Sequence, residues 1–92
     1  MRLSKKEVET IKKVINEFFI KPDIYLFGSR LDTSKKGGDI DLFIISKDKD
    51  LLRKKVKAIA RLERILNKPV DIVLHRDFQR VIEQEALKGE LL

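Results

Sequence analysis

The stretch from Leu26 to Ile45, LFGSRLDTSKKGGDIDLFII, decides the fold, because a polar, glycine-containing segment separates two short apolar runs. The apolar runs predict two β-strands, and Gly28 at the end of the first run predicts a tight turn. The second run begins with two carboxylates, Asp39 and Asp41. Because successive side chains of a strand point to opposite faces, these two carboxylates are expected to share one face.

A third carboxylate, Asp71, lies in a later apolar run, Val70–Leu74. A lone carboxylate in a half-buried strand is unfavourable unless it has partners. Two unit charges about 4 Å apart repel by roughly 4 kcal/mol at an effective dielectric constant near 20, so three converging carboxylates favour bound cations. Carboxylate oxygens suit magnesium, which proteins bind together with substrate phosphates. We therefore interpret Asp39, Asp41 and Asp71 as a metal site.

The turn at Gly28 and Ser29 is expected to supply the phosphate side of the same site. Glycine lets backbone N–H groups approach a phosphate closely, and the hydroxyl of Ser29 can cap the turn that follows. Arg30 adjoins this turn, so it is a further candidate for nucleotide binding. A phosphate-binding turn beside metal-binding carboxylates indicates nucleotidyl or phosphoryl transfer.

In this order and context, Gly28-Ser29, Asp39-x-Asp41 and Asp71 resemble the nucleotidyltransferase superfamily of DNA polymerase β. At this chain length the resemblance is to its minimal nucleotidyltransferase (MNT) family. It implies an enzyme that transfers a nucleoside monophosphate, AMP from ATP, to a hydroxyl, with two Mg²⁺ ions held by the three aspartates. Asp71 is also implied as an acceptor for the hydroxyl proton.

The same resemblance implies a protein partner. MNT proteins are commonly paired with a separate helical HEPN protein in toxin–antitoxin modules, and they attach AMP to a tyrosine of that toxin. We therefore expect this chain to act as an antitoxin on a HEPN partner.

Two other functions stay open. The family spacing between Gly-Ser and Asp-x-Asp is usually ten residues, whereas Arg30–Gly38 make nine. This shorter segment favours a non-catalytic antitoxin that masks its partner. An antibiotic-modifying nucleotidyltransferase would need a dimer to build its acceptor pocket, because 92 residues leave no room for a second domain.

Composition sets the class of protein. Ninety-two residues predict one domain, 1–92, and the absence of cysteine excludes disulfides and thiolate metal sites. No apolar run approaches the ~20 residues of a membrane span, and the charged N-terminus is no signal peptide, so we expect a cytoplasmic protein without a membrane partner. The net charge of +6 comes from 39% charged residues of both signs, which favours a solvated surface over a dedicated nucleic-acid face.

Helices are expected around the two strands. Ser4-Lys5-Lys6-Glu7 is a capping box that predicts a helix over residues 5–19. Two further helices are predicted over residues 51–66 and 77–87. The apolar face of the second is predicted from residues at helical spacing: Leu52, Val56, Ile59, Leu62 and Leu66. We expect an α/β (α+β) domain with a small mixed sheet of three to four strands and helices packed on one face, the polymerase β-like nucleotidyltransferase fold.

Overall fold

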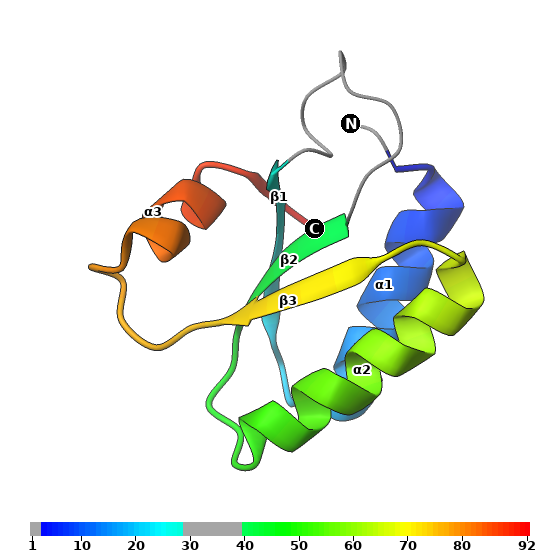
Figure 1. The fold of residues 1–92 in the computed structure, drawn as a ribbon, viewed down its shortest axis with the longest axis horizontal. Helices are drawn as coiled ribbons and strands as arrows, with labels where there is room; N and C mark the ends of the chain where they lie inside the picture. The colour runs from blue at the N-terminus through cyan, green and yellow to red at the C-terminus, as the bar shows by residue number, and fades with distance from the viewer. Residues whose placement is uncertain (1–2, 29–39) are drawn as a thin grey trace.

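A computed structural model describes residues 3–28 and 40–92 of the chain. The described helices and strands between residues 5 and 87 follow in the order that the sequence predicts, and the helix over residues 51–66 and the strand over residues 70–74 have the predicted bounds. Figure 1 shows the elements in chain order, which are α1 (Lys5–Phe18), β1 (Asp23–Phe27), β2 (Ile40–Ile45), α2 (Leu51–Leu66), β3 (Val70–Leu74), α3 (Val81–Leu87) and β4 (Glu90–Leu91).

The sheet is mixed and has the strand order β3-β2-β1-β4. Strand β1 runs antiparallel to both β2 and β4, and β2 runs parallel to β3. Parallel neighbours need a crossover connection, which α2 provides between β2 and β3. Strand β2 therefore lies inside the sheet, with a partner on each side, and the predicted mixed sheet is confirmed.

The alternation of side chains along β2 builds two apolar clusters. Ile40, Leu42 and Ile44 are fully buried and pack in the main core with α1 and α2. On the other face, Phe43 packs with Phe27 of β1 and Ala86 of α3 in a smaller cluster. The two long helices thus cover one face of the sheet as predicted, and the short α3 covers part of the other (Figure 1).

The predicted capping box at the start of α1 is confirmed. The backbone N–H of Glu7 donates to Ser4 Oγ at 3.1 Å, and the backbone N–H of Ser4 donates to Glu7 Oε1 at 3.0 Å. Lys68, in the turn between α2 and β3, donates to the Glu7 carboxylate at 2.7 Å and lowers the pKa of Glu7. These contacts join the start of α1 to the end of α2.

Two details differ from the sequence prediction. Leu52 and Val56 are 70% and 60% exposed, so they do not lie on the core side of α2, where Ala58 and Leu62 are fully buried. The last helix begins at Val81 because residues 77–80 form a turn closed by the Arg80 N–H on the carbonyl of Asp77 at 3.0 Å. Within the described residues, no helix combines the length and the apolarity that a membrane crossing requires.

Replacing a buried leucine of α2 tests its placement. Leu62→Ala is expected to lower the free energy of unfolding by about 2–5 kcal/mol, because it removes a fully buried side chain and leaves a cavity. Leu52→Ala, the same substitution on the exposed side of the same helix, is expected to change it by about 0.5 kcal/mol or less. Urea denaturation of both variants measures the difference. Equal losses of stability would contradict the observed placement, in which Leu62 faces the core and Leu52 faces solvent.

Candidate active site

The pairing of three strands brings two of the predicted carboxylates together. Asp41 lies opposite Phe27 in the antiparallel β1–β2 pair and opposite Asp71 in the parallel β2–β3 pair. Residues paired on neighbouring strands share a face, and the strands are about 4.8 Å apart. Asp41 and Asp71 therefore stand side by side on the sheet face that α1 and α2 do not cover.

The two carboxylates differ in their surroundings. Asp41 is half-buried, because its strand has a neighbour on each side. Asp71 is exposed on β3, the edge strand, where its Oδ1 accepts a hydrogen bond from the backbone N–H of Ile72 at 3.0 Å. One carboxylate is thus held within the sheet, and the other is accessible at its edge.

Gly28 lies directly against the carboxylate of Asp41. Its φ of +78° is in the left-handed region, and a β-carbon at this position would collide with Asp41 Oδ2. Only glycine combines this backbone conformation with such a close approach. Gly28 thus has a backbone conformation suited to the predicted tight turn, and it lies against one of the predicted metal-binding carboxylates.

Three of the predicted site residues, Ser29, Arg30 and Asp39, lie outside the described residues. Within residues 3–28 and 40–92, no three His, Cys, Asp or Glu side chains gather as a metal site. The two adjoining aspartates are nevertheless hard oxygen donors of the kind that Mg²⁺ prefers, and Mg²⁺ is commonly held by one or two carboxylates plus substrate phosphates. The carboxylates of Asp41 and Asp71, with Gly28 next to Asp41, fit that ion.

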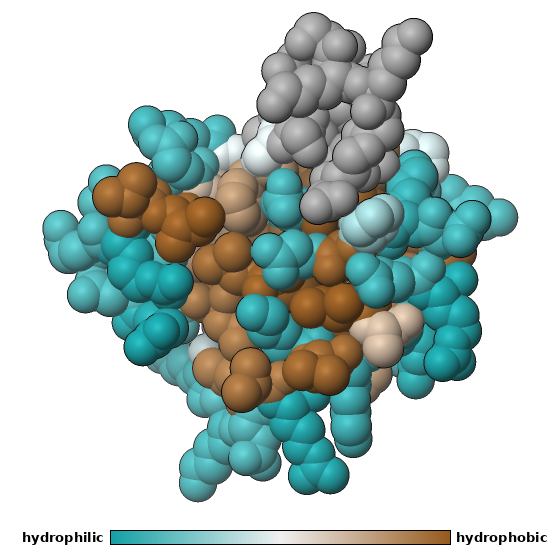
Figure 2. Space-filling view, in the orientation of Figure 1, coloured by the Kyte–Doolittle hydropathy of each residue, from teal (hydrophilic) through white to brown (hydrophobic). Residues whose placement is uncertain are grey.

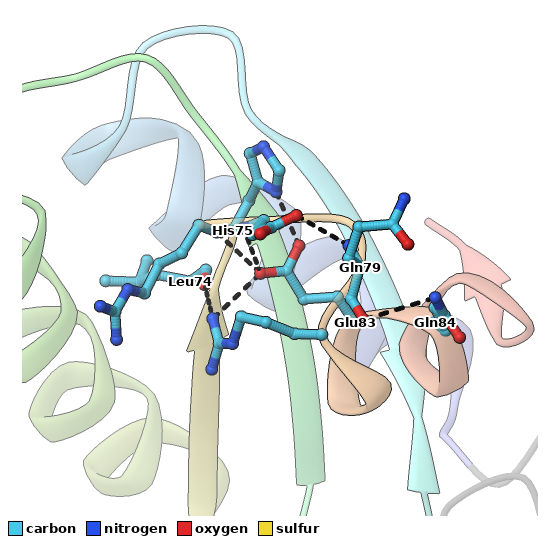
Figure 3. A network of polar contacts seen from close by, with 8 residues as sticks. Leu74, His75, Gln79, Glu83 and Gln84 are labelled. Carbon is cyan, nitrogen blue, oxygen red and sulfur yellow. Dashed lines mark hydrogen bonds and ion pairs between the residues drawn. The ribbon is translucent and has the colours of Figure 1, made fainter.

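A second polar cluster, which the sequence reading missed, surrounds the fully buried Glu83 (Figure 3). His75 Nδ1 lies 2.7 Å from Glu83 Oε1, and Arg80 donates to Oε2 at 3.0 Å. The backbone N–H groups of Arg76 and Asp77 donate to the same Oε2 at 2.7 and 3.0 Å. Glu83 thus ties the whole connection between β3 and α3 to the helix.

This cluster shapes the far end of the sheet face that carries the carboxylates. The His75 ring stacks on Phe78 at 4.0 Å between centroids and meets the edge of Phe43 at 6.4 Å. The i,i+3 spacing of Arg80 and Glu83 is the one sequence signal that could have pointed to the cluster. The other partners of Glu83, which are His75, Arg76 and Asp77, do not stand at a helical spacing of three or four residues from it.

Burial and hydrogen bonding oppose each other at Glu83. Burial raises the pKa of this carboxyl, but the Asp77 N–H, His75 and the Arg76 N–H together outweigh it and lower the pKa from 4.5 to about 2. A carboxyl whose pKa is lower in the folded state contributes stability above its unfolded pKa and loses it as the pH falls toward the folded value. The contribution of Glu83 is therefore full above about pH 4.5 and lost progressively toward pH 2.

Acid titration of stability tests this contribution. Between pH 5 and pH 2.5 the free energy of unfolding of Glu83→Gln is expected to fall less steeply than that of the native chain, because the variant has no carboxyl to protonate. Glu85→Gln, an exposed glutamate of the same helix, is expected to keep the native slope. Urea denaturation at a series of pH values measures all three slopes, and a native slope in Glu83→Gln would contradict the assignment.

The contact between Gly28 and Asp41 is open to a double-mutant cycle. Gly28→Ala is expected to destabilise the native chain by about 2 kcal/mol, because it adds a steric collision to the cost of a left-handed backbone. In an Asp41→Ala background the collision is absent, so the same change is expected to cost only about 1 kcal/mol. Urea denaturation gives both values, and strict additivity would show that the two residues do not touch.

Comparison with known proteins agrees with this geometry. No curated protein sequence matches the chain. A chain of the solved complex between the tri-AMPylated HEPN toxin of Shewanella oneidensis and an MNT antitoxin is 24% identical and superposes with a TM-score of 0.74, over 95% of this chain and 68% of that one. This similarity shows a shared fold. Residues 9–92 match the family described as Polymerase beta, Nucleotidyltransferase, so the family predicted from Gly28-Ser29, Asp39-x-Asp41 and Asp71 is confirmed, and the chain is a member of the polymerase β nucleotidyltransferase family.

Proposed function

We propose that this chain is a Mg²⁺-dependent nucleotidyltransferase that transfers AMP from ATP to a tyrosine hydroxyl of a separate HEPN-type protein, and so acts as its antitoxin. The observation that carries the proposal is the close approach of Gly28 to Asp41, with Asp71 next to Asp41 in register. Family membership supports nucleotidyl transfer. The similarity to a complex of an AMPylated HEPN toxin with an MNT antitoxin supports the acceptor and the partner.

Nucleotide binding falls to the turn that starts at Gly28. Its missing side chain lets the Asp41 carboxylate pack against the backbone of Gly28, so a metal ion held by Asp41 would lie next to this turn. Ser29 and Arg30 follow directly in the sequence and are expected to contact the same phosphates. Mg²⁺ ions held by Asp39, Asp41 and Asp71 would neutralise charge on the triphosphate and lower the pKa of the acceptor hydroxyl.

The transfer itself exchanges one bond for another. The acceptor oxygen attacks the α-phosphorus of ATP, the bond from that phosphorus to the oxygen that bridges to the β-phosphate breaks, and pyrophosphate leaves with the electron pair. The hydroxyl proton needs an acceptor within reach. Asp71 suits this role better than Asp41, because Asp71 is exposed at the edge of the sheet whereas Asp41 is half-buried inside it.

The open face of the sheet favours a protein as the acceptor. Helices α1 and α2 cover the opposite face, so an acceptor must reach the carboxylates over the face that α3 borders. Phe78, just before α3, and Val81 and Ile82, in α3, are 46%, 74% and 42% exposed, and Figure 2 shows apolar surface over this helix. Apolar surface beside a site is typical of contact with a protein partner.

Masking of the partner without catalysis is the alternative, and the nine residues from Arg30 to Gly38 favour it. The two carboxylates held side by side count against it. A site without chemistry has no need to keep two like charges on neighbouring strands, where they repel each other.

AMP transfer to a HEPN-type protein tests the proposal. With ATP and Mg²⁺ present, the native chain is expected to add AMP to a tyrosine of the partner, and Asp41→Asn and Asp71→Asn are each expected to reduce the rate about 10²-fold or more. Asp50→Asn, which removes a carboxylate before α2 at a left-handed position that asparagine tolerates, is expected to keep the native rate. Mass spectrometry of the intact partner and of its peptides measures the transfer.

The other outcomes separate the remaining functions. Tight binding of the partner by the native chain, with no AMP added, would replace the proposal by masking. AMP transfer to aminoglycosides in place of the protein would assign a small-molecule acceptor.

A further inference from the structure

Helix α2 carries most of the net charge of the chain. Leu51–Leu66 contains six Lys or Arg residues and one acid, a formal charge of +5, while the whole chain carries +6. The one acid, Glu63, accepts a hydrogen bond from the backbone N–H of Val70 at 2.9 Å. Its charge is therefore engaged at the turn after the helix.

Some of these basic side chains line a groove between the C-terminal end of α1 and the solvent-facing side of α2. Two adjoining hollows of about 680 and 370 Å³ share Phe18 and Lys57 in their walls. Arg53, Lys57 and Arg64, which we call the basic row, line them. These three residues follow at i, i+4 and i+11, so they lie along one side of the helix over about 16 Å.

No ion pair within the described residues engages the basic row, although Glu17 and Asp50 also line the larger hollow. Two other cations of α2 have partners, since Lys54 pairs with Asp48 and Arg61 pairs with Glu17, each at 3.2 Å. The three members of the basic row are exposed and form no ion pair with any residue of the described ranges 3–28 and 40–92. They are therefore available to an external anion.

An aromatic ring adjoins the row of cations. Phe18 forms part of the wall of both hollows and is partly buried against the main core. The guanidinium of Arg61 lies over its ring, 5.4 Å from the centroid, so a planar cation and an aromatic ring already stack in this wall. Proteins that bind single-stranded nucleic acid combine these two features, because cations follow the phosphate backbone and aromatic rings stack on bases.

We propose that the basic row and Phe18 form a binding site for single-stranded nucleic acid. A single line of three cations matches the phosphates of one strand. The groove lies on the helical side of the sheet, away from Asp41 and Asp71, so a bound strand and a bound nucleotide do not compete.

Fluorescence anisotropy with a labelled 15-nucleotide oligouridylate tests the site on the full chain at 50 mM salt. The native chain is expected to bind, with log K falling against log[salt] at a slope near −2, about −0.7 for each of three neutralised phosphates. The variant Arg53→Gln/Lys57→Gln/Arg64→Gln is expected to bind at least about tenfold more weakly with a slope near zero.

A matched variant separates the site from the overall charge. Lys6→Gln/Lys12→Gln/Arg76→Gln removes the same number of charges from exposed positions outside the groove, and it is expected to change affinity less than about threefold. Glutamine is a good helix former, so circular dichroism and urea midpoints should show both variants folded. Equal weakening in the two variants, no binding at 50 mM salt, or binding to phosphatidylserine vesicles but not to RNA would each overturn the proposal.

Discussion

The pairing of β2 with β1 on one side and β3 on the other is the constraint on which the rest of the structure depends. Its alternating side chains must place Ile40, Leu42 and Ile44 against α1 and α2. Asp41 is therefore forced onto the opposite face, because a shift of one residue would exchange the two faces and bury a charge. Packing of the apolar core on one face of the sheet thus fixes the position of the carboxylates on the other face. Gly28 and Asp71 reach this site only because their strands share this register.

The fold keeps its carboxylates in two different ways. Glu83 is completely buried, and its two oxygens are surrounded by two backbone N–H groups, an imidazole and a guanidinium. Such a group is structural, because every change of partner leaves a buried charge unsatisfied. Asp71 is exposed on an edge strand, with one backbone hydrogen bond. A carboxylate of this kind keeps oxygen atoms available for a cation or a proton, which is what a reactive site requires.

Local signals predicted much of this structure, and long-range ones did not. The bounds of α2 and β3 and the capping box of α1 follow from local periodicity and capping chemistry. The position of Asp71 beside Asp41 also needs the pairing of β2 with β3, which the sequence analysis assumed. The core side of α2 was predicted in part: Ile59, Leu62 and Leu66 pack in the core, whereas Leu52 and Val56 are exposed. Ala58 also faces the core but is too small to mark that side in the sequence. Strand β4 is two residues long and forms only by pairing with β1. The strand order and the Glu83 cluster depend on contacts between distant residues, which a single sequence does not encode in its periodicity.

The connection between Gly28 and Ile40 joins two strands that align by their own pairing. Changing the length of such a segment by one residue alters the entropy of loop closure by only about 0.1 kcal/mol. Asp41 then keeps its place opposite Phe27 and Asp71, whereas one residue inserted within β2 would turn the carboxylate toward the core. Insertions and deletions between Arg30 and Asp39 therefore cost little stability, whereas insertions within the strands move Asp41 off its face. The number of residues between the two predicted halves of the site can vary during evolution, while the positions of Asp41 and Asp71 cannot.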